Sequence, residues 1–204
     1  MIRTGPRPST AGWPEIGLTY HGGVKVRHYA RLLYEEVGPR RIREAVVRPL
    51  TGYRFAPHYG CHYLKPGEIM DYFDPAEEPR SLAELIDCLG AESVDYPGLK
   101  DCCGGGVLGV NEALAQAMAF RKLDQVHRLD VTGLVVICPF CNVMFEGQQK
   151  AIAKKHGVNL KVPLFFYPQL LGLALGFSPE DMGFKLNRIK DRDMLKALEA
   201  RSDA

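Results

Sequence analysis

The sequence carries no marked excess of charge of either sign. Lysine and arginine together number 26 of its 204 residues, and aspartate and glutamate number 24, so the net charge is only +2. Proteins that bind nucleic acid or an anionic membrane surface through their overall charge have a clear basic excess. The even balance therefore argues against both functions, and we expect the chain to bind no nucleic acid.

Long uninterrupted apolar runs are also missing. The longest apolar segment, residues 162–177, is broken by Pro163, Pro168 and Gln169 and is too short to cross a bilayer. The first 14 residues are rich in proline, glycine, serine and arginine, without the apolar run of a secretory signal. We therefore expect no membrane insertion and a cytoplasmic location. Cysteines in that reducing compartment bind metals or carry out redox chemistry rather than form structural disulfides.

Strand patterns and helix patterns alternate along the chain. Short apolar or β-branched runs predict strands at 53–59, 92–96, 134–137 and 161–167. Amphipathic spacing and end signals predict helices at 24–37, 40–47, 81–89 (opened by a capping box of Ser81 and Glu84), from Asn111 onward, at 142–156, at 169–175 and from Ser178 onward. This order is typical of an α/β fold, a layered and mainly parallel sheet with flanking helices. Sites in such sheets lie at the carboxyl ends of the strands.

Five of the six cysteines follow a predicted strand, either directly or in the loop after it. They are Cys61, Cys102, Cys103, Cys138 and Cys141. Because the carboxyl ends of parallel strands lie along one edge of a sheet, we expect these thiols to converge in a single pocket. The sixth cysteine, Cys88, lies within the predicted helix 81–89, where a buried, small apolar role is the expected one.

The residues around these cysteines suit a metal site. Gly104 and Gly105, within a run of three glycines, allow close backbone approach, so their amides can hydrogen-bond to sulfur. The Cys138-Pro139-Phe140-Cys141 turn places two thiols at a predicted helix start. His62 follows Cys61, and we expect it to contact a bound group from outside the ligand set. The other histidines considered, His28, His58, His127 and His156, carry no signal of a functional role.

Three kinds of chemistry are compatible with these residues. Thiolates prefer zinc, copper(I) or iron–sulfur clusters to harder metals. Structural zinc takes four ligands, as does an ordinary iron–sulfur cubane, so five cysteines leave one over in both cases. A metal-free thiol–disulfide oxidoreductase using the Cys138-x-x-Cys141 pair is the third alternative, because a strand, this turn and a helix also form the redox turn of glutaredoxins. That alternative gives no role to Cys61, Cys102 or Cys103.

The spacing of the five cysteines resembles that of a known family. Forty residues separate Cys61 from the Cys102-Cys103-Gly104 motif, and thirty-four separate Cys103 from the Cys138-x-x-Cys141 motif. This pattern closely resembles the cysteine-rich CCG domain of the heterodisulfide reductase B subunit. The segments 59–66 and 95–98 match as well, and the likeness extends over about residues 21–176.

The resemblance implies a non-cubane 4Fe–4S cluster held by all five cysteines, one of them bridging. In this family, the B subunit has two such domains, and a disulfide substrate is cleaved between their two clusters. This sequence has one set of cysteines, similar to the C-terminal of the two domains. Either a second polypeptide supplies the other cluster, or the chain only relays electrons, as part of an oxidoreductase complex rather than an enzyme active alone.

The resemblance also implies partners and a domain organisation. The expected partners are a flavin subunit, a ferredoxin-like subunit and a second chain with a CCG domain, together with a thiol or disulfide substrate. We expect residues 1–20 to form a flexible or draped arm, 21–184 to form the CCG iron–sulfur domain, and 185–204 to form a helical tail. Apolar residues at helical spacing in the tail predict that it packs on its own domain.

Overall fold

The computed structural model of the protein describes residues 16–17 and 26–200. Most of the expected N-terminal arm, 1–20, therefore lies outside the described residues. The centre of the described part is a sheet made of β1 (Arg54–His58), β2 (Glu92–Ser93), β3 (Gly133–Val136) and β4 (Leu164–Phe166). The strand order is β2-β1-β3-β4, and all neighbouring strands are parallel. The predicted α/β fold with a parallel sheet is confirmed.

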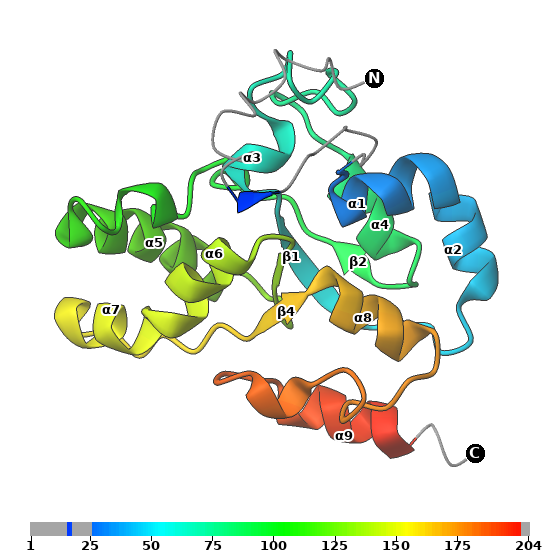
Figure 1. Cartoon of the computed structure of the whole chain (residues 1–204). Helices are drawn as coiled ribbons and strands as arrows, with labels where there is room; N and C mark the ends of the chain where they lie inside the picture. The colour runs from blue at the N-terminus through cyan, green and yellow to red at the C-terminus, as the bar shows by residue number, and fades with distance from the viewer. Residues whose placement is uncertain (1–15, 18–25, 201–204) are drawn as a thin grey trace.

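Helices cover both faces of this sheet (Figure 1). One face is covered by α1 (Tyr29–Leu32), the π-helical turn η3 (Leu33–Val37), α2 (Pro39–Ala45), α4 (Ser81–Asp87), α8 (Tyr167–Ala174) and α9 (Arg192–Ala200). The other is covered by α5 (Glu112–His127), the π-helical turn η5 (Val143–Gly147) and α7 (Gln149–His156). The short helices are α3 (Cys61–Leu64), η4 (Gly105–Val107), α6 (Pro139–Asn142) and η6 (Phe184–Leu186).

The side chains of each strand point alternately to the two faces of the sheet, which divides the core into two clusters. Phe55, Val135 and Phe165 belong to the cluster under α4 and α8, whereas Ala56 and Leu134 belong to the cluster under α5 and α7. Successive strand residues point to opposite faces of a sheet, so both faces of these strands are apolar because both are covered. No helix in the described ranges is long and apolar enough to cross a membrane.

Pro57 lies inside β1 although it has no amide hydrogen to donate. β2 pairs only with Arg54 and Phe55, so β1 extends beyond its neighbour on that side. The carbonyl oxygen of Pro57 instead accepts a hydrogen bond from the Tyr96 hydroxyl at 3.1 Å. A proline is tolerated where the strand has no partner for its nitrogen.

Several helix ends differ from the prediction. The Asn111 side chain caps α5 by accepting from the Leu114 amide at 2.9 Å, as predicted. The prediction of a capping box formed by Ser81 and Glu84 is wrong. The Asp74 carboxylate, six residues upstream of Arg80, instead accepts hydrogen bonds from the amides of both Arg80 and Ser81. The helix predicted at 142–156 begins earlier, at Pro139 in α6. No α-helix starts at Ser178, where the chain forms turns followed by η6. In the described part of the segment 24–37, helix begins only with α1.

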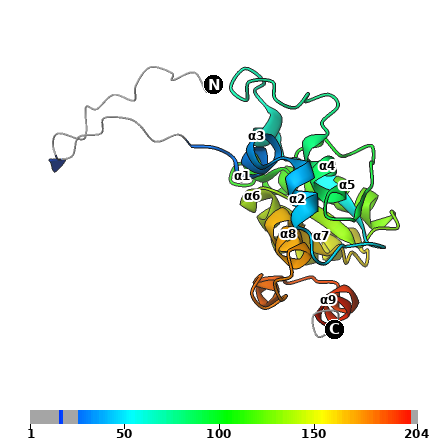
Figure 2. The same ribbon diagram turned by 90° about the vertical axis from the view of Figure 1, so that its right-hand side faces the viewer.

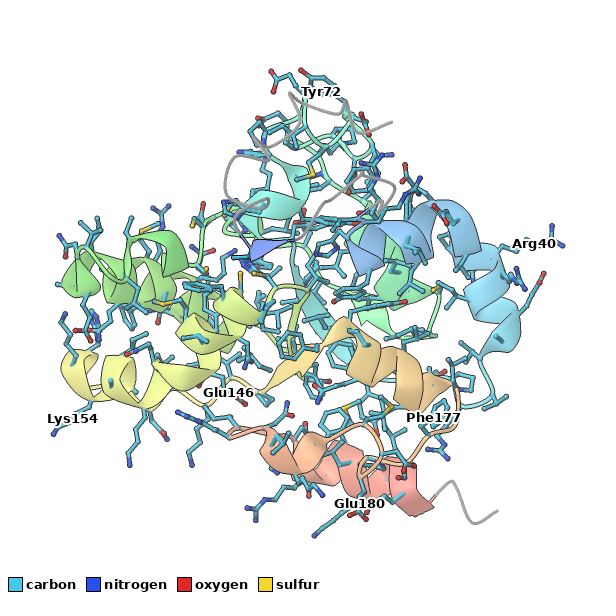
Figure 3. The ribbon with its side chains drawn as sticks, viewed as in Figure 1. Arg40, Tyr72, Glu146, Lys154, Phe177 and Glu180 are labelled. Carbon is cyan, nitrogen blue, oxygen red and sulfur yellow. The ribbon has the colours of Figure 1, made fainter. Side chains whose placement is uncertain are left out.

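The C-terminal helix packs on the rest of the molecule, as the apolar spacing predicts. Met194, Leu195 and Leu198 of α9 belong to the same core cluster as α4 and α8. Figure 2 shows α9 at the bottom of the molecule, beyond α8. The Glu146 carboxylate accepts from the backbone amides of Arg188 and Ile189, and Figure 3 shows Glu146 beside this segment. The tail therefore contacts both the core and the helix that follows Cys141.

Replacing Leu198 with alanine tests this packing. The Leu198 side chain is fully buried, so Leu198→Ala is expected to lower the free energy of unfolding by about 2–5 kcal/mol through lost burial and a cavity. Urea denaturation followed by circular dichroism measures the change. Lys196→Ala on the exposed side of α9 is the control, with an expected change within about 0.5 kcal/mol. Equal effects for the two variants would show that α9 is not part of the cooperative unit.

Candidate metal centre

The carboxyl ends of three neighbouring strands build the candidate site. β1 leads through Gly60, whose φ is +73°, into α3, which starts with Cys61. β3 leads through Ile137 to Cys138, the N-cap of α6, and Pro139 occupies the first helical position as expected. The loop after β2 carries the remaining pair of cysteines and ends at η4. Figure 1 shows α3 above the upper end of β1, with α6 beside it.

All five predicted cysteines line a single cavity of about 470 Å³ at this edge of the sheet. Cys103 and Cys141 are buried at its inner side, Cys102 and Cys138 are partly exposed, and Cys61 is exposed. The structure thus brings together residues separated by up to 80 positions, as the parallel sheet led us to expect. Their role as ligands stays a prediction.

Backbone amides donate to two of the thiols. The Gly104 amide nitrogen lies 3.4 Å from the Cys102 sulfur, and the Gly105 amide nitrogen lies 3.4 Å from the Cys103 sulfur. Gly104 adopts a φ of +84°, a left-handed conformation that favours glycine. Hydrogen bonds from amides to sulfur stabilise the thiolate form, which is the form that binds metals.

The buried thiols of Cys103 and Cys141 shift each other's pKa in opposite directions. A hydrogen bond with Cys141 is the main cause that lowers the pKa of Cys103 to about 6, and the Gly105 amide lowers it further. The same hydrogen bond raises the pKa of Cys141, and burial adds to this effect. Burial and the neighbouring Cys102 raise the pKa of Cys61. Of the two buried thiols, Cys103 is therefore the one that more readily forms the thiolate.

His58 and Lys122 are functional candidates that the sequence did not indicate. His58 ends β1 and is buried, and its Nε2 lies 3.2 Å from the Cys141 sulfur. Its Nδ1 lies 2.8 Å from the Nζ of Lys122, which is fully buried on α5. We expected no functional role for His58, and the structure places its ring beside Cys141. One signal was present: Lys122 lies seven residues after Ala115 and four before Val126, on the apolar face of a predicted helix.

The remaining predicted residues occupy different positions around the cavity. His62 is exposed and lines the cavity beside Cys61. His28, for which no role was expected, also lines the cavity, and its Nδ1 accepts from the Ala30 amide. Cys88 is 1% exposed, lies outside the cavity and donates to the Leu85 carbonyl, as expected for a cysteine used as a small core residue.

The lining suits a thiolate-bound iron–sulfur cluster. Among the described residues no carboxylate lines the cavity, so sulfur atoms are the main ligands on offer, and these select soft metals. Tyr59, Tyr63, Ile137 and Phe140 supply an apolar wall that limits access of water.

Comparison with known proteins finds similarity to a family of cysteine-rich proteins. The cysteine-rich domain family CCG matches residues 55–146, a range that contains all five cavity cysteines. The B subunit of the ferredoxin:CoB-CoM heterodisulfide reductase of Methanosarcina mazei is 39% identical over 184 residues, covering 89% of this chain and 60% of the relative. The chain is similar to the heterodisulfide reductase B subunit, and its cysteine-containing part matches the CCG domain. It spans about 60% of the length of that relative.

Other proteins that the chain resembles have different names. The 8-methylmenaquinol:fumarate reductase membrane anchor subunit of Wolinella succinogenes is 27% identical over 172 residues, covering 84% of this chain and 60% of that protein. A crystal structure of a hypothetical protein from Helicobacter pylori matches with a TM-score of 0.64 and 14% identity, covering 90% of this chain and 32% of that one. The latter shows a shared fold only.

Proposed function

We propose that the chain is an iron–sulfur electron-transfer subunit of a heterodisulfide-reductase-like complex. In this proposal one non-cubane 4Fe–4S cluster is held by Cys61, Cys102, Cys103, Cys138 and Cys141. The complex acts in thiol/disulfide redox chemistry, and the chain is not active alone. The cytoplasm is the proposed location, because a reducing compartment keeps such thiols free of disulfides.

The gathering of five thiols in one cavity is the observation that supports this proposal. A tetrahedral zinc site uses four ligands, so a fifth thiol in the same pocket favours a cluster with more than one metal. The Gly104 and Gly105 amides donate to sulfur, and the aromatic wall keeps water from the inner thiols. When bound, the cluster would supply one-electron transfer, and these residues would set its potential.

The exposure of the site supports an exchange of electrons with a partner. Cys61 is exposed and Phe140 is 56% exposed, so the cavity lies at the surface rather than in the centre of the molecule. The two named reductase relatives are subunits of multi-subunit reductases. We propose the same for this chain, with a flavin subunit, a ferredoxin-like subunit and a second CCG-domain chain as partners. The thiol or disulfide substrate would lie between the two clusters.

Metal and sulfide analysis of the anaerobically purified full chain tests the proposal. We expect a brown protein with about four iron and four acid-labile sulfide ions per chain. Chelation of the iron should remove the visible absorption without unfolding the protein, because the two apolar clusters of the core do not depend on the metal. A colourless protein without sulfide, even after reconstitution with iron and sulfide, would refute the proposed function.

A zinc-binding structural or interaction module is the second candidate. His58, Cys103 and Cys141 are buried, and their ligand atoms lie within 4.8 Å of one another, close enough to hold a single metal ion. Lys122 already occupies the other nitrogen of His58, so Nε2 faces the thiols. This alternative predicts about one zinc per chain and no sulfide in the same analysis.

A further inference from the structure

Lys122 is a buried ammonium group beside the cysteine cavity. Its side chain is on the inner face of α5 and has no exposed surface. The Nζ atom lies 2.8 Å from His58 Nδ1 and 3.1 Å from the Leu99 carbonyl oxygen, with the Tyr96 ring 5.5 Å away. Lysine is among the residues least often fully buried, and it is found so only with compensating partners.

Asp101 and the cavity cysteines favour the charged form of Lys122. Burial lowers the pKa of Lys122 to about 8, while Asp101, Cys141 and Cys103 oppose this shift. Asp101 also forms an ion pair with Arg121, at 3.7 Å. Thiolates bound to a metal carry permanent negative charge in this pocket. A buried lysine next to them is thus more favourable in the loaded protein than in the empty one.

The contacts of Lys122 also fix the protonation of His58. A charged lysine can only donate hydrogen bonds, so His58 Nδ1 must accept and carries no proton. An imidazole ring with a bare Nδ1 carries its proton on Nε2, which therefore donates to the Cys141 sulfur at 3.2 Å.

The orientation of the histidine ring is held from the side as well. Phe145 packs edge-to-face on the His58 ring, with centroids 4.9 Å apart. Both partners are buried, so the ring cannot turn away from Cys141 without displacing the core. The result is a directed chain of hydrogen bonds from Lys122 through His58 to the innermost thiol.

We propose that Lys122 is a positioning residue that acts through His58 to raise the reduction potential of the metal centre and to retain the metal. Positive charge near a cluster and hydrogen bonds to its sulfurs stabilise the reduced, more negative state. This inference rests on the proposed function, because it concerns the potential of the bound cluster. It goes beyond the ligand set, because neither residue binds the metal.

Potentiometric titration of the loaded full chain tests this role. In Lys122→Met, a side chain of similar length without charge, we expect the ratio of reduced to oxidised centre at a fixed applied potential to fall about tenfold. This ratio corresponds to a shift of about 59 mV to more negative potential for a one-electron couple. Lys122→Arg keeps the charge and should restore most of the wild-type ratio. Lys154→Met is the matched control, since it removes the same charge from an exposed position on α7 (Figure 3).

A double variant tests the path through His58. If Lys122 acts through the ring, the effect of Lys122→Met should be smaller in a His58→Phe background than in the wild type. A lysine that only fills space predicts the opposite order, with Lys122→Met harmless and the larger Lys122→Arg harmful. Unchanged potentials in Lys122→Met and Lys122→Gln would overturn the inference while leaving the proposed function intact.

Loss of the metal in the variants is also decisive. A Lys122→Met protein that keeps the circular dichroism of the wild type but loses iron, while Lys122→Arg retains it, would support the role in retention. Failure of Lys122→Met and Lys122→Gln to fold would assign Lys122 a purely structural role and refute the inference. A wild-type chain that takes up no iron and sulfide would instead refute the proposed function, and the inference would fall with it.

Discussion

Cys141→Ser is expected to remove most of the bound iron and sulfide. Cys141 is 3% exposed, lines the cavity with the other four cysteines and accepts the His58 hydrogen bond, so its sulfur lies at the buried side of the thiol group. A serine oxygen at this position is a harder and poorer ligand for the metals that thiolates select. We expect iron per chain to fall at least about fivefold, measured together with the visible absorption of the anaerobically purified protein.

Cys88→Ser is the matched control for this experiment. Cys88 is equally buried but lies outside the cavity, and a serine hydroxyl can make the same donation to the Leu85 carbonyl. It should retain the wild-type content of iron and sulfide. If Cys88→Ser and Cys141→Ser lost equal amounts of iron, the loss would reflect general destabilisation rather than removal of a ligand.

The same substitution at Cys61 separates the cluster from the metal-free alternative. A five-cysteine cluster needs Cys61, so Cys61→Ser should also lose iron, although less completely, because this thiol is at the exposed side of the cavity. A thiol–disulfide oxidoreductase based on Cys138 and Cys141 would tolerate Cys61→Ser and lose activity in Cys138→Ser. Iron that stays bound in Cys61→Ser would therefore argue against ligation by five cysteines.

The sequence predicted where the thiols converge because convergence follows from topology alone. Parallel strands end at one edge, so Cys61 after β1 and Cys138 after β3 had to be neighbours once the strands were identified. Strand lengths were less predictable, because the end of β2 at Ser93 depends on tertiary contacts that no local pattern records. The short β2 also explains Pro57. This proline fits into β1 only because β2 pairs with Arg54 and Phe55 and does not extend alongside Pro57.

The Lys122–His58 chain was harder to predict because it depends on burial and not on residue type. Lysine on a helix is normally solvated, and histidine at the end of a strand has many ordinary roles. Only the packing of α5 against the face of β1 that carries Ala56 and His58 places the two side chains together. The helix cap formed by Asp74 was hard to predict for the same reason, because it depends on tertiary structure. The capping side chain lies seven residues before Ser81 and replaces the predicted local capping box.

Gly104→Ala is expected to disrupt the site through the backbone rather than through a ligand. A Cβ atom at Gly104 would lie 2.7 Å from the carbonyl oxygen of Ala115 and 3.0 Å from its Cα, so it would collide with the backbone of α5. The φ of +84° adds strain for any residue with a side chain. We expect the free energy of unfolding to fall by about 2–4 kcal/mol, and iron binding to weaken because Cys102 and Cys103 shift with the loop.

Gly106→Ala, two residues away in the same glycine run, is the matched control. A Cβ atom at Gly106 meets no heavy atom within 4 Å among the residues that the structure describes, and its φ lies outside the left-handed region. The variant should therefore change stability by no more than about 0.5 kcal/mol and keep its iron. Thermal unfolding and iron analysis of both variants give the comparison. If Gly104→Ala binds iron as Gly106→Ala does, the close approach of this loop to α5 is not what holds Cys102 and Cys103 in the cavity. The positions of the thiols in the cavity would then depend on the ends of β1 and β3 alone.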